Sequence, residues 1–321
     1  MKKVAFSILL TLFATQMSAQ ESQTGYNFLR LPMSAHAAAL GGDNITLIED
    51  DEALIFHNPA LLSSVSDKTI NLNYMNYMSG VNIASASFNR IVKEKASWAV
   101  SAQYVDYGKM KQTDENNIQM GEFSAKDIAL TGYFSYMLGE KIAGGIAAKF
   151  VTSYIGDYNS IAVGVDLGLN YYDPEREWSV SAVAKNLGGQ LKAYDEEYEK
   201  MPIDLQVGVN KRFVNTPFRV SCTLSNLNHW DSGLKNHAAL GAELLLSENI
   251  WVGAGYNFRR AKEMKIVSNE DINNNDNSGS SHGAGLSFGG GINLERFHLN
   301  IAYGKYHVSS SSILINVNYK L

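Results

Sequence analysis

Large apolar side chains and small or polar ones alternate along several stretches of the chain. From Ile161 to Tyr171 the odd positions are large and apolar, while the even positions are small or polar and include Asp166 and Asn170. The same two-residue period recurs over 203–213 and 313–321. Because side chains alternate between the two faces of a strand, each stretch predicts a strand with one apolar and one polar face. This pattern is typical of a lipid-facing barrel wall, and equally of a soluble antiparallel sheet with one wet face.

The pattern predicts about fourteen strands from residue 70 onward. Most of them are about 9 to 13 residues long, which suits a tilted membrane strand, whereas soluble strands usually have about 5 to 6 residues. The expected spans are 70–78, 81–91, 96–107, 126–138, 141–154, 160–172, 177–187, 203–213, 218–226, 237–247, 250–260, 283–293, 296–306 and 312–321.

The connections between these strands sort by length. Those after every second strand are short and polar, whereas long ones follow strands three, seven, nine and eleven, at 108–125, 188–202, 227–236 and 260–282. Outer-membrane barrels have short periplasmic turns, long external loops and an even number of strands. A soluble sandwich has no reason to sort its loops in this way. We therefore expect an all-β protein, a transmembrane antiparallel β-barrel in the outer membrane of a Gram-negative bacterium, with both chain ends periplasmic and the long loops extracellular.

The first residues have the pattern of a secretory signal. Lys2 and Lys3 precede an apolar run over 4–13, and Met17-Ser18-Ala19 provides a cleavage site before Gln20. An uncleaved membrane anchor is the alternative, but the apolar run is shorter than the ~20 residues that a spanning helix needs. We predict a signal peptide over 1–19.

Charge and cysteine content narrow the function classes. Removal of Lys2 and Lys3 from the 27 lysines and arginines leaves 25 against 32 acidic residues, so the formal net charge moves from −5 to −7. An acidic chain of this kind gives no reason to expect a nucleic-acid partner. The lone Cys222 lies within a strand pattern, so we expect no internal disulfide, and closure of the sheet must hold the exported chain together.

The segment from 20 to 66 differs from the rest. Ser34 precedes an alanine-rich stretch that ends at Gly41-Gly42, which predicts a short capped helix, and a second one is expected over 51–56, stopped at Asn58-Pro59. A wall of fourteen strands encloses more space than its own side chains fill, because barrel diameter grows with strand number. We expect this segment to plug the barrel formed by 67–321.

Motifs that could carry chemistry lack their required context. Residues 285–289 fit the Gly-x-Ser-x-Gly elbow around Ser287, but they lie within a predicted strand and no acid and histidine follow in the order that a hydrolase needs. Residues 271–275 match the opening of a calcium loop, yet Asp276 and His282 stand where Gly and Glu are needed. The histidines form no metal-binding cluster. We expect no enzyme activity, no cofactor and no metal; a weak calcium loop and loop-borne catalytic residues are the alternatives.

The N-terminal segment carries a longer motif. Residues 27–42 read Asn-Phe-Leu-Arg-Leu-Pro-Met-Ser-Ala-His-Ala-Ala-Ala-Leu-Gly-Gly, and residues 56–61 read Phe-His-Asn-Pro-Ala-Leu. They resemble the N-terminal signature of the PorV/PorQ family, FadL-like outer-membrane proteins of the type IX secretion system; the length is more similar to PorQ. His36 stands where relatives often carry Arg, which weakens any claim about a charge contact at that position. The motif residues of the plug are Phe28, Leu29, Pro32, Ser34, Ala35, Gly41, Gly42, Asn58, Pro59 and Ala60.

The resemblance implies a non-enzymatic role with protein partners. It implies a barrel that anchors a secreted surface protein of the PorZ type, which presents anionic lipopolysaccharide to the sortase attachment complex of PorU and PorV, while outer-membrane lipid surrounds the wall. On this interpretation the loops at 108–125, 188–202 and 260–282 are the candidate partner surface; tolerated surface insertions are the alternative. Two other functions stay open: a FadL-like transporter of hydrophobic small molecules, and a PorV-like shuttle that brings cargo to the sortase.

Overall fold

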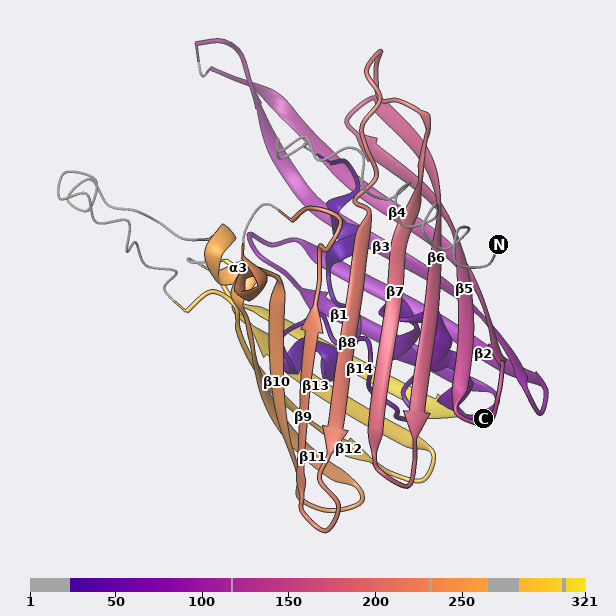
Figure 1. Cartoon of the computed structure of the whole chain (residues 1–321). Helices are drawn as coiled ribbons and strands as arrows, with labels where there is room; N and C mark the ends of the chain where they lie inside the picture. Colours follow the sequence, from indigo (N-terminus) through magenta and orange to yellow (C-terminus); the bar gives the residue numbers. More distant parts are fainter. Residues whose placement is uncertain (1–23, 117, 231–232, 265–282, 308–309) are drawn as a thin grey trace.

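Fourteen antiparallel strands close into a single barrel (Figure 1). The structure is a computed structural model and describes residues 24–116, 118–230, 233–264, 283–307 and 310–321. The barrel closes where the first strand pairs with the last, Ile70 opposite Tyr319. The strands are β1 (Thr69–Asn76), β2 (Asn82–Lys93), β3 (Ala96–Thr113), β4 (Gln119–Met137), β5 (Ile142–Ile155), β6 (Tyr158–Asp173), β7 (Trp178–Lys192), β8 (Asp204–Arg212), β9 (Phe218–Leu224), β10 (Ala238–Leu245), β11 (Ile250–Asn257), β12 (Leu286–Asn293), β13 (Phe297–Gly304) and β14 (Ser312–Lys320). The predicted fourteen-stranded barrel is confirmed.

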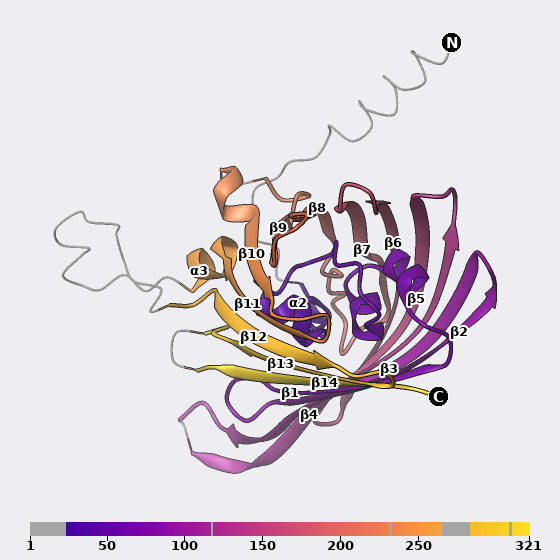
Figure 2. The same ribbon diagram turned by 90° about the horizontal axis from the view of Figure 1, so that it is seen from below.

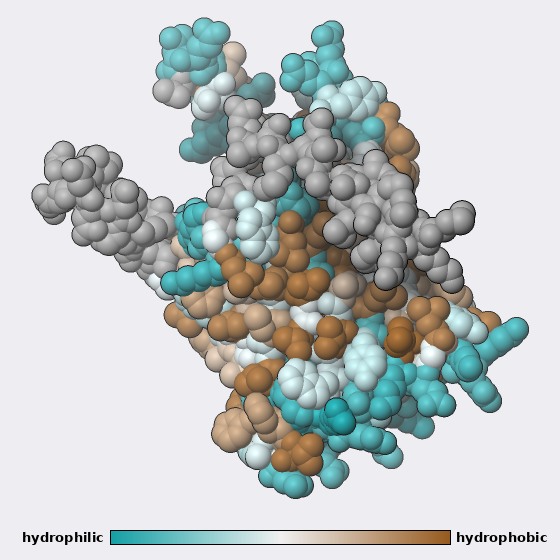
Figure 3. All heavy atoms as spheres, in the orientation of Figure 1, coloured by the Kyte–Doolittle hydropathy of each residue, from teal (hydrophilic) through white to brown (hydrophobic). Residues whose placement is uncertain are grey.

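The wall is apolar outside and polar inside, as the alternating pattern predicts. In β6, Leu167 and Leu169 are 46% and 52% exposed, whereas Asp166 and Asn170 are only 2% and 4% exposed. On the face drawn in Figure 3, hydrophobic side chains gather in a band across the strands. An exposed apolar surface of this extent marks a region that meets lipid or another protein.

The two ends of the barrel differ. At one end, the turn end, the connections at 94–95, 138–141, 174–177, 213–217, 246–249 and 294–296 are short; the opposite end is the loop end. Leu321 donates a backbone hydrogen bond to Lys68 at the turn end, whereas Thr24 pairs with Lys200 in the β7–β8 connection at the loop end. The described chain thus starts at the loop end, and the following segment runs through the barrel to the turn end.

The predicted long loop at 108–125 is largely a strand pair. β3 continues to Thr113 and β4 begins at Gln119, and the register between them shifts between Asp106 and Lys109. Beyond this shift the two strands continue as a pair that starts with Lys109 opposite Ser124. In Figure 1 this extension of β3 and β4 projects beyond the ends of the neighbouring strands. We call the two strands of this extension, 109–113 and 119–124, the ribbon. The sequence pattern missed it because both faces of a strand outside the lipid are wet, so the alternation disappears.

The ends of β7 and β11 are among the other strand ends that differ from the predicted spans. β7 extends to Lys192 instead of ending at 187, since Gly188 and Gly189 pair with β6. β11 ends at Asn257 instead of 260, and helix α3 (Phe258–Glu263) follows. The Asn257 side chain accepts a hydrogen bond from the Arg260 N–H at 3.0 Å and thereby starts this helix.

The segment from Tyr26 to Ser66, which we call the plug, fills the interior (Figure 2). It contains the 3₁₀ helices η1 (Asn27–Arg30), η2 (Glu52–Phe56) and η3 (Pro59–Ser64) and the helix α2 (Ala35–Ala39). Ser34 caps α2 through the Ala37 N–H, as predicted. Helix α2 packs against β12, β13 and β14, whereas η3 packs against β4, β5 and β6. The plug therefore joins opposite parts of the wall.

The Asn58-Pro59 pair does more than stop a helix. It separates η2 from η3, because the Asn58 side chain accepts a hydrogen bond from the Ala60 N–H at 3.0 Å and Pro59 occupies the first helical position. Proline is suited to that position, where its missing N–H would have no helical partner. The prediction of a stop was right for η2, but the η3 helix that begins there was not foreseen.

Candidate functional site: the plug and the loop end

The ten motif residues are all buried in the plug. Ser34, Ala35, Asn58 and Ala60 have no exposed surface, and the remaining motif residues are also classed as buried: Phe28, Leu29, Pro32, Gly41, Gly42 and Pro59. Asn58 in addition donates to the Ile45 carbonyl at 3.1 Å, which ties η3 to the preceding turn. The motif therefore builds the plug and its contacts with the wall, and these residues offer no surface to an external partner.

Inward side chains of the last and twelfth strands hold α2. Asn316 of β14 accepts a hydrogen bond from the Ala35 N–H and donates to the Met33 carbonyl at 2.9 Å. Ser287 of β12 donates to the Ala39 carbonyl at 2.9 Å and accepts from the Gly41 N–H at 3.0 Å. The serine of the Gly-x-Ser-x-Gly sequence thus has both of its hydrogen-bonding roles occupied by the plug.

A buried ion cluster joins the plug to β9 and β10. His36 Nε2 lies 3.1 Å from Glu243 Oε1, and Arg219 reaches Glu243 Oε2 at 3.1 Å and Glu49 Oε1 at 2.5 Å. The imidazole also stacks on the Trp251 ring, with 3.8 Å between centroids. His36 therefore contacts a carboxylate and an aromatic ring of the wall. Buried charges are tolerated only when paired, so this cluster fixes how the plug sits.

A second polar contact lies near Gly41 and Gly42. Asp43 accepts a hydrogen bond from Asn257 Nδ2 at 2.8 Å, and Arg259 of α3 lies 3.8 Å from the same carboxylate. Asn257 also donates to the Gly41 carbonyl at 3.0 Å. Asn257 therefore caps α3 and binds the plug with one side chain, which couples the conformation of this connection to the seating of the plug.

Close backbone approach depends on glycines in the wall. A side chain on Gly255 would overlap the backbone of Leu40 and Gly41, and one on Gly145 would overlap the backbone of Pro59 and Ala60. Glycine is the one residue that lets two backbones approach this closely. The wall is therefore shaped to receive the plug on both sides.

Two titratable groups of the plug are buried away from water. Burial of the carboxyl raises the pKa of Glu52 to about 8, with the Ser87 hydroxyl opposing the shift. Burial likewise lowers the pKa of His57 to about 3. The neutral imidazole accepts a hydrogen bond from the Ser34 N–H at 3.4 Å. Both groups favour their uncharged forms in the seated plug.

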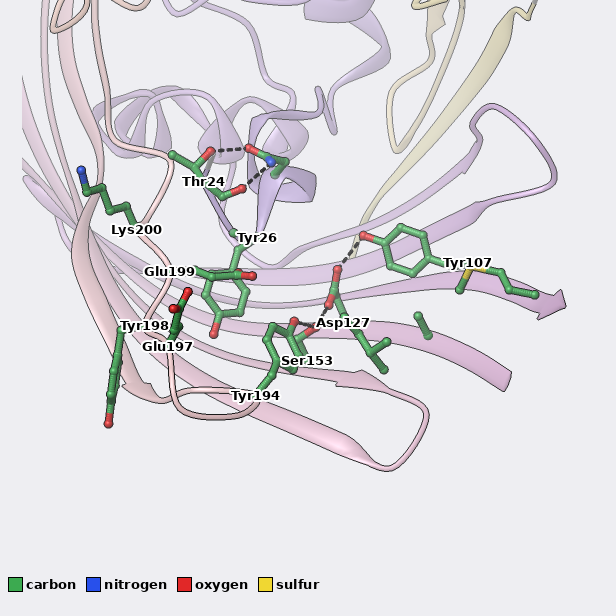
Figure 4. A pocket seen from close by; sticks show the side chains of 15 residues that line it. Thr24, Tyr26, Tyr107, Asp127, Ser153, Tyr194, Glu197, Tyr198, Glu199 and Lys200 are labelled. Carbon is green, nitrogen blue, oxygen red and sulfur yellow. Dashed lines mark hydrogen bonds between the residues drawn. The ribbon is translucent and has the colours of Figure 1, made fainter. Parts of the chain in front are cut away.

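A cavity of about 790 Å³ opens where the plug begins, beside the ribbon and the β7–β8 connection (Figure 4). Tyrosine rings and carboxylates dominate its lining. The lining residues are Thr24, Gly25, Tyr26, Asn27, Tyr107, Met110, Ala125, Asp127, Ser153, Ile155, Tyr194, Glu197, Tyr198, Glu199 and Lys200. We call this cavity the loop-end pocket.

Hydrogen bonds fix the floor of the loop-end pocket. The Tyr107 hydroxyl donates to Asp127 Oδ2 at 2.6 Å, and the other carboxylate oxygen of Asp127 accepts from Ser153. The Ser153 hydroxyl also bonds the Tyr194 hydroxyl, and the Tyr26 hydroxyl accepts from Gln190 at 3.0 Å. These residues come from the plug, β3, β4, β5, β7 and the β7–β8 connection, so the pocket exists only in the closed barrel.

A hollow of about 720 Å³ lies on the outer, apolar side of the wall. It crosses β8 to β11, and its residues include Val209, Cys222, Leu240 and Tyr256. Gly255 also lines it, and Leu40 and Gly41 of the plug lie directly behind this glycine. The wall is therefore thin here, with the plug as its backing.

Several sequence-based candidates lie outside the described residues. These are the signal segment 1–19, the calcium-like stretch 271–276 with His282, and most of the loop at 260–282. Within the described ranges, no group of three or more His, Cys, Asp or Glu is arranged to hold a metal ion. No helix of the described chain is long and apolar enough to cross a bilayer.

Sequence reasoning did not find the loop-end pocket. Its residues come from separate segments, and no motif links them. One signal was available: Asp127 occupies an inward position of β4, two positions from the inward Ala125 and Ala129. A charged residue at such a position needs a partner from elsewhere, but the sequence does not name Tyr107 or Ser153 as that partner.

A closed antiparallel barrel with an apolar outer band and a folded N-terminal plug defines the class of outer-membrane β-barrel proteins. A sequence model of the family described as "Type IX secretion system membrane protein PorP/SprF" matches residues 132–312, more than half of the 321 residues. The chain belongs to this family. The match lies within the barrel wall, whereas the likeness to PorV and PorQ rests on the plug alone. A comparison with curated proteins found no match.

Solved structures with a similar fold are FadL-like barrels. The Pseudomonas putida toluene transporter TodX has 12% identity and a TM-score of 0.57, and covers 89% of this chain and 97% of its own. The monoaromatic hydrocarbon channel CymD has 15% identity and a TM-score of 0.56, and the match covers 90% of this chain and 96% of CymD. A Pseudomonas aeruginosa FadL homologue has 9% identity and a TM-score of 0.55, and the match covers 90% of this chain and 98% of the homologue. At these identities the likeness shows the fold.

Proposed function

We propose that this protein is an outer-membrane component of the type IX secretion system that holds a secreted partner at the cell surface and catalyses no reaction. The resemblance of the plug motif to PorV and PorQ suggests the finer role, an anchor for a PorZ-type protein next to the attachment complex of PorU and PorV. Family membership supports the secretion system, and the structure of the loop end supports the binding role.

The observation that carries the proposal is the dense set of contacts that seats the plug in the barrel. The cluster of His36, Glu243 and Arg219 is buried, and unpairing such a charge costs about 3 to 5 kcal/mol. Asn316 and Ser287 add backbone contacts with α2. A lumen filled in this way is a poor route for cargo. The accessible features that distinguish this barrel, the ribbon and the loop-end pocket, are at the loop end.

The orientation follows from the same proposal. The loop end faces the outside of the cell, and the turn end with Leu321 faces the periplasm, since long connections of outer-membrane barrels are external. The apolar band then contacts outer-membrane lipid. A protease added to intact cells would cut at the loop end and leave the turn end intact; cleavage only after outer-membrane permeabilisation would contradict this orientation.

A pull-down from detergent-solubilised outer membranes tests the binding role. We expect the full-length barrel to co-purify with a large secreted surface protein. In a variant, residues 110–123, which include most of the ribbon and the turn between its strands, are replaced by Asn-Gly. This dipeptide closes a two-residue hairpin between the paired Lys109 and Ser124. This variant should keep the barrel folded and lose partner. Equal recovery of the partner would remove the ribbon from the interface.

The loop at 260–282 is tested separately. Deletion of residues 268–281, which lie outside the described residues, should leave the barrel folded and release the partner into the medium. Retention of the partner at the cell surface would exclude this loop as the anchor. If a changing set of cargo proteins co-purifies instead of one constant partner, the PorV-like shuttle role replaces the anchor.

The hollow across β8 to β11 favours a second candidate, a transporter of hydrophobic small molecules. It is apolar, and only thin wall at Gly255 separates it from the plug. TodX and CymD, which share the fold, are described as a toluene transporter and a hydrocarbon channel. Uptake of a labelled fatty acid and of toluene by cells with and without the protein tests this candidate, and equal uptake removes it.

A further inference from the structure

We infer that the loop-end pocket binds a basic side chain, lysine or arginine, presented by an exposed segment of a protein partner. The inference rests on the proposed binding role and adds the chemistry of the contact. Three observations carry it: the tyrosine rings that line the cavity, the unpaired carboxylates at its rim, and the rigidity of the segment that carries them.

The tyrosines offer ring surface to the cavity. The hydroxyls of Tyr26, Tyr107 and Tyr194 are engaged with side chains of the wall. The parts of these rings that remain free to line the cavity are therefore aromatic carbon. Tyr198 adds a ring that is 65% exposed at the rim. The negative face of an aromatic ring attracts a cation.

The rim carries negative charge without a cationic partner. Glu197 and Glu199 line the pocket, and no ion pair within the described ranges uses either carboxylate. Among the described residues, Lys200 is the one basic residue that lines the pocket, and its side chain points away from the cavity in Figure 4. An anionic ligand would meet these carboxylates and is excluded on charge. A cation would gain charge-assisted hydrogen bonds from these carboxylates.

The segment that carries the carboxylates is held in place. The Glu199 N–H donates to Gln190 Oε1 at 2.7 Å. The Gly25 N–H donates to the Lys200 carbonyl at 3.0 Å, which ties the β7–β8 connection to the start of the plug. A ligand therefore meets a preformed site and loses little free energy in ordering it. The volume of about 790 Å³ admits a short peptide segment around the basic side chain.

The β7–β8 connection also supplies a matched control. Asp195 and Glu196 precede Glu197 in the same exposed connection but do not line the pocket. The double variant Glu197→Gln/Glu199→Gln and the control Asp195→Asn/Glu196→Gln remove the same charge from the same segment. All four positions are exposed, so neither variant perturbs the fold.

The test is a titration of the purified barrel in detergent with two capped peptides, Gly-Arg-Gly-Arg-Gly and its citrulline analogue, which keeps the shape and removes the charge. We expect the arginine peptide to bind at least about tenfold more tightly than the citrulline peptide, and Glu197→Gln/Glu199→Gln to lose about tenfold. The control variant should stay within about threefold, since exposed charges outside a site contribute little.

Several outcomes would overturn the inference. They are equal binding of the two peptides, unchanged binding by the pocket variant, an equal loss in the control variant, and binding of a neutral oligosaccharide in place of the peptide. A pull-down with the pocket variant separates this inference from the proposed function. If the secreted partner still co-purifies, the pocket is not its contact and the anchor role stands; if the unaltered barrel captures no partner, the anchor role itself fails.

Discussion

Asn316 in the last strand accepts a hydrogen bond from the backbone N–H of Ala35, in helix α2 of the plug. The two residues are separated by almost the whole barrel sequence, yet they are neighbours because the wall closes around the segment that precedes it. The same amide donates to the Met33 carbonyl at 2.9 Å. The last strand therefore completes the barrel and the seat of the plug at once, so the plug can be fully seated only after the wall has closed.

Replacement of Asn316 by leucine should loosen the plug. Leucine has a similar size but leaves the Ala35 N–H and the Met33 carbonyl without partners, and each unpaired buried group costs about 1 to 3 kcal/mol. We expect a lower melting temperature and faster proteolysis within 26–66. The control is Asn76→Leu at an exposed strand end. Equal proteolysis of the Asn316 and Asn76 variants would show that Asn316 does not hold the plug.

The ion cluster should behave as a unit. Arg219→Met leaves Glu243 buried without its arginine and should destabilise the protein by about 3 to 5 kcal/mol, whereas Arg219→Met/Glu243→Gln should cost less because the more deeply buried carboxylate is neutralised together with the loss of its arginine. Lys109→Met breaks the exposed pair with Glu122 and should cost less than about 1 kcal/mol. Denaturant unfolding of the three variants measures these differences. A double variant less stable than Arg219→Met would contradict the pairing argument.

Close packing at Gly255 gives a third prediction. Valine at this position would overlap the backbone of Leu40 and Gly41, and overpacking typically costs about 1 to 3 kcal/mol. Gly132→Val is the matched control, because a side chain there meets nothing within 4 Å. We expect the Gly255 variant alone to release the plug to protease. A stable, protease-resistant Gly255→Val protein would mean that the plug does not approach the wall as closely as described.

The alternation of apolar and polar side chains predicted the barrel wall because contact with lipid requires an apolar outer face on each strand. Each membrane-crossing strand must show an apolar face, as Leu167 and Leu169 do, and this requirement is local and readable in sequence. The ribbon escaped prediction because four of the five residues from Lys109 to Thr113 are charged or polar, so no apolar period is visible there. The seat of the plug escaped it for a different reason: the pairing of Asn316 with Ala35 depends on closure of the barrel, which no local pattern encodes. The loop-end pocket was missed for both reasons: part of its lining lies at strand ends without an apolar period, and its residues meet only in the closed barrel.

The buried groups of η2 and its C-cap make plug stability depend on pH in two directions. The pKa of Glu52 is raised from 4.5 to about 8, so the seated plug binds a proton that the released plug does not, and this stabilisation is lost as pH rises from about 4.5 through about 8. The pKa of His57 is lowered from 6.5 to about 3, so its contribution is present above pH 6.5 and is lost as pH falls towards 3. The seated plug should therefore be most stable at an intermediate pH.

The variant Glu52→Gln separates the two effects. It keeps the shape of the side chain and removes the ionisation, so the loss of stability between pH 5 and pH 9 should largely disappear while the loss below pH 6 remains. The full Glu52 effect has an upper bound of roughly 5 kcal/mol, the free energy that corresponds to a pKa raised from 4.5 to about 8. Melting temperature and proteolysis of the plug, measured from pH 4 to pH 9 on both proteins, check the prediction. If Glu52→Gln and the unaltered protein lose stability equally at pH 9, the carboxyl of Glu52 does not enter the seated plug as a neutral acid, and the alkaline loss must come from another group.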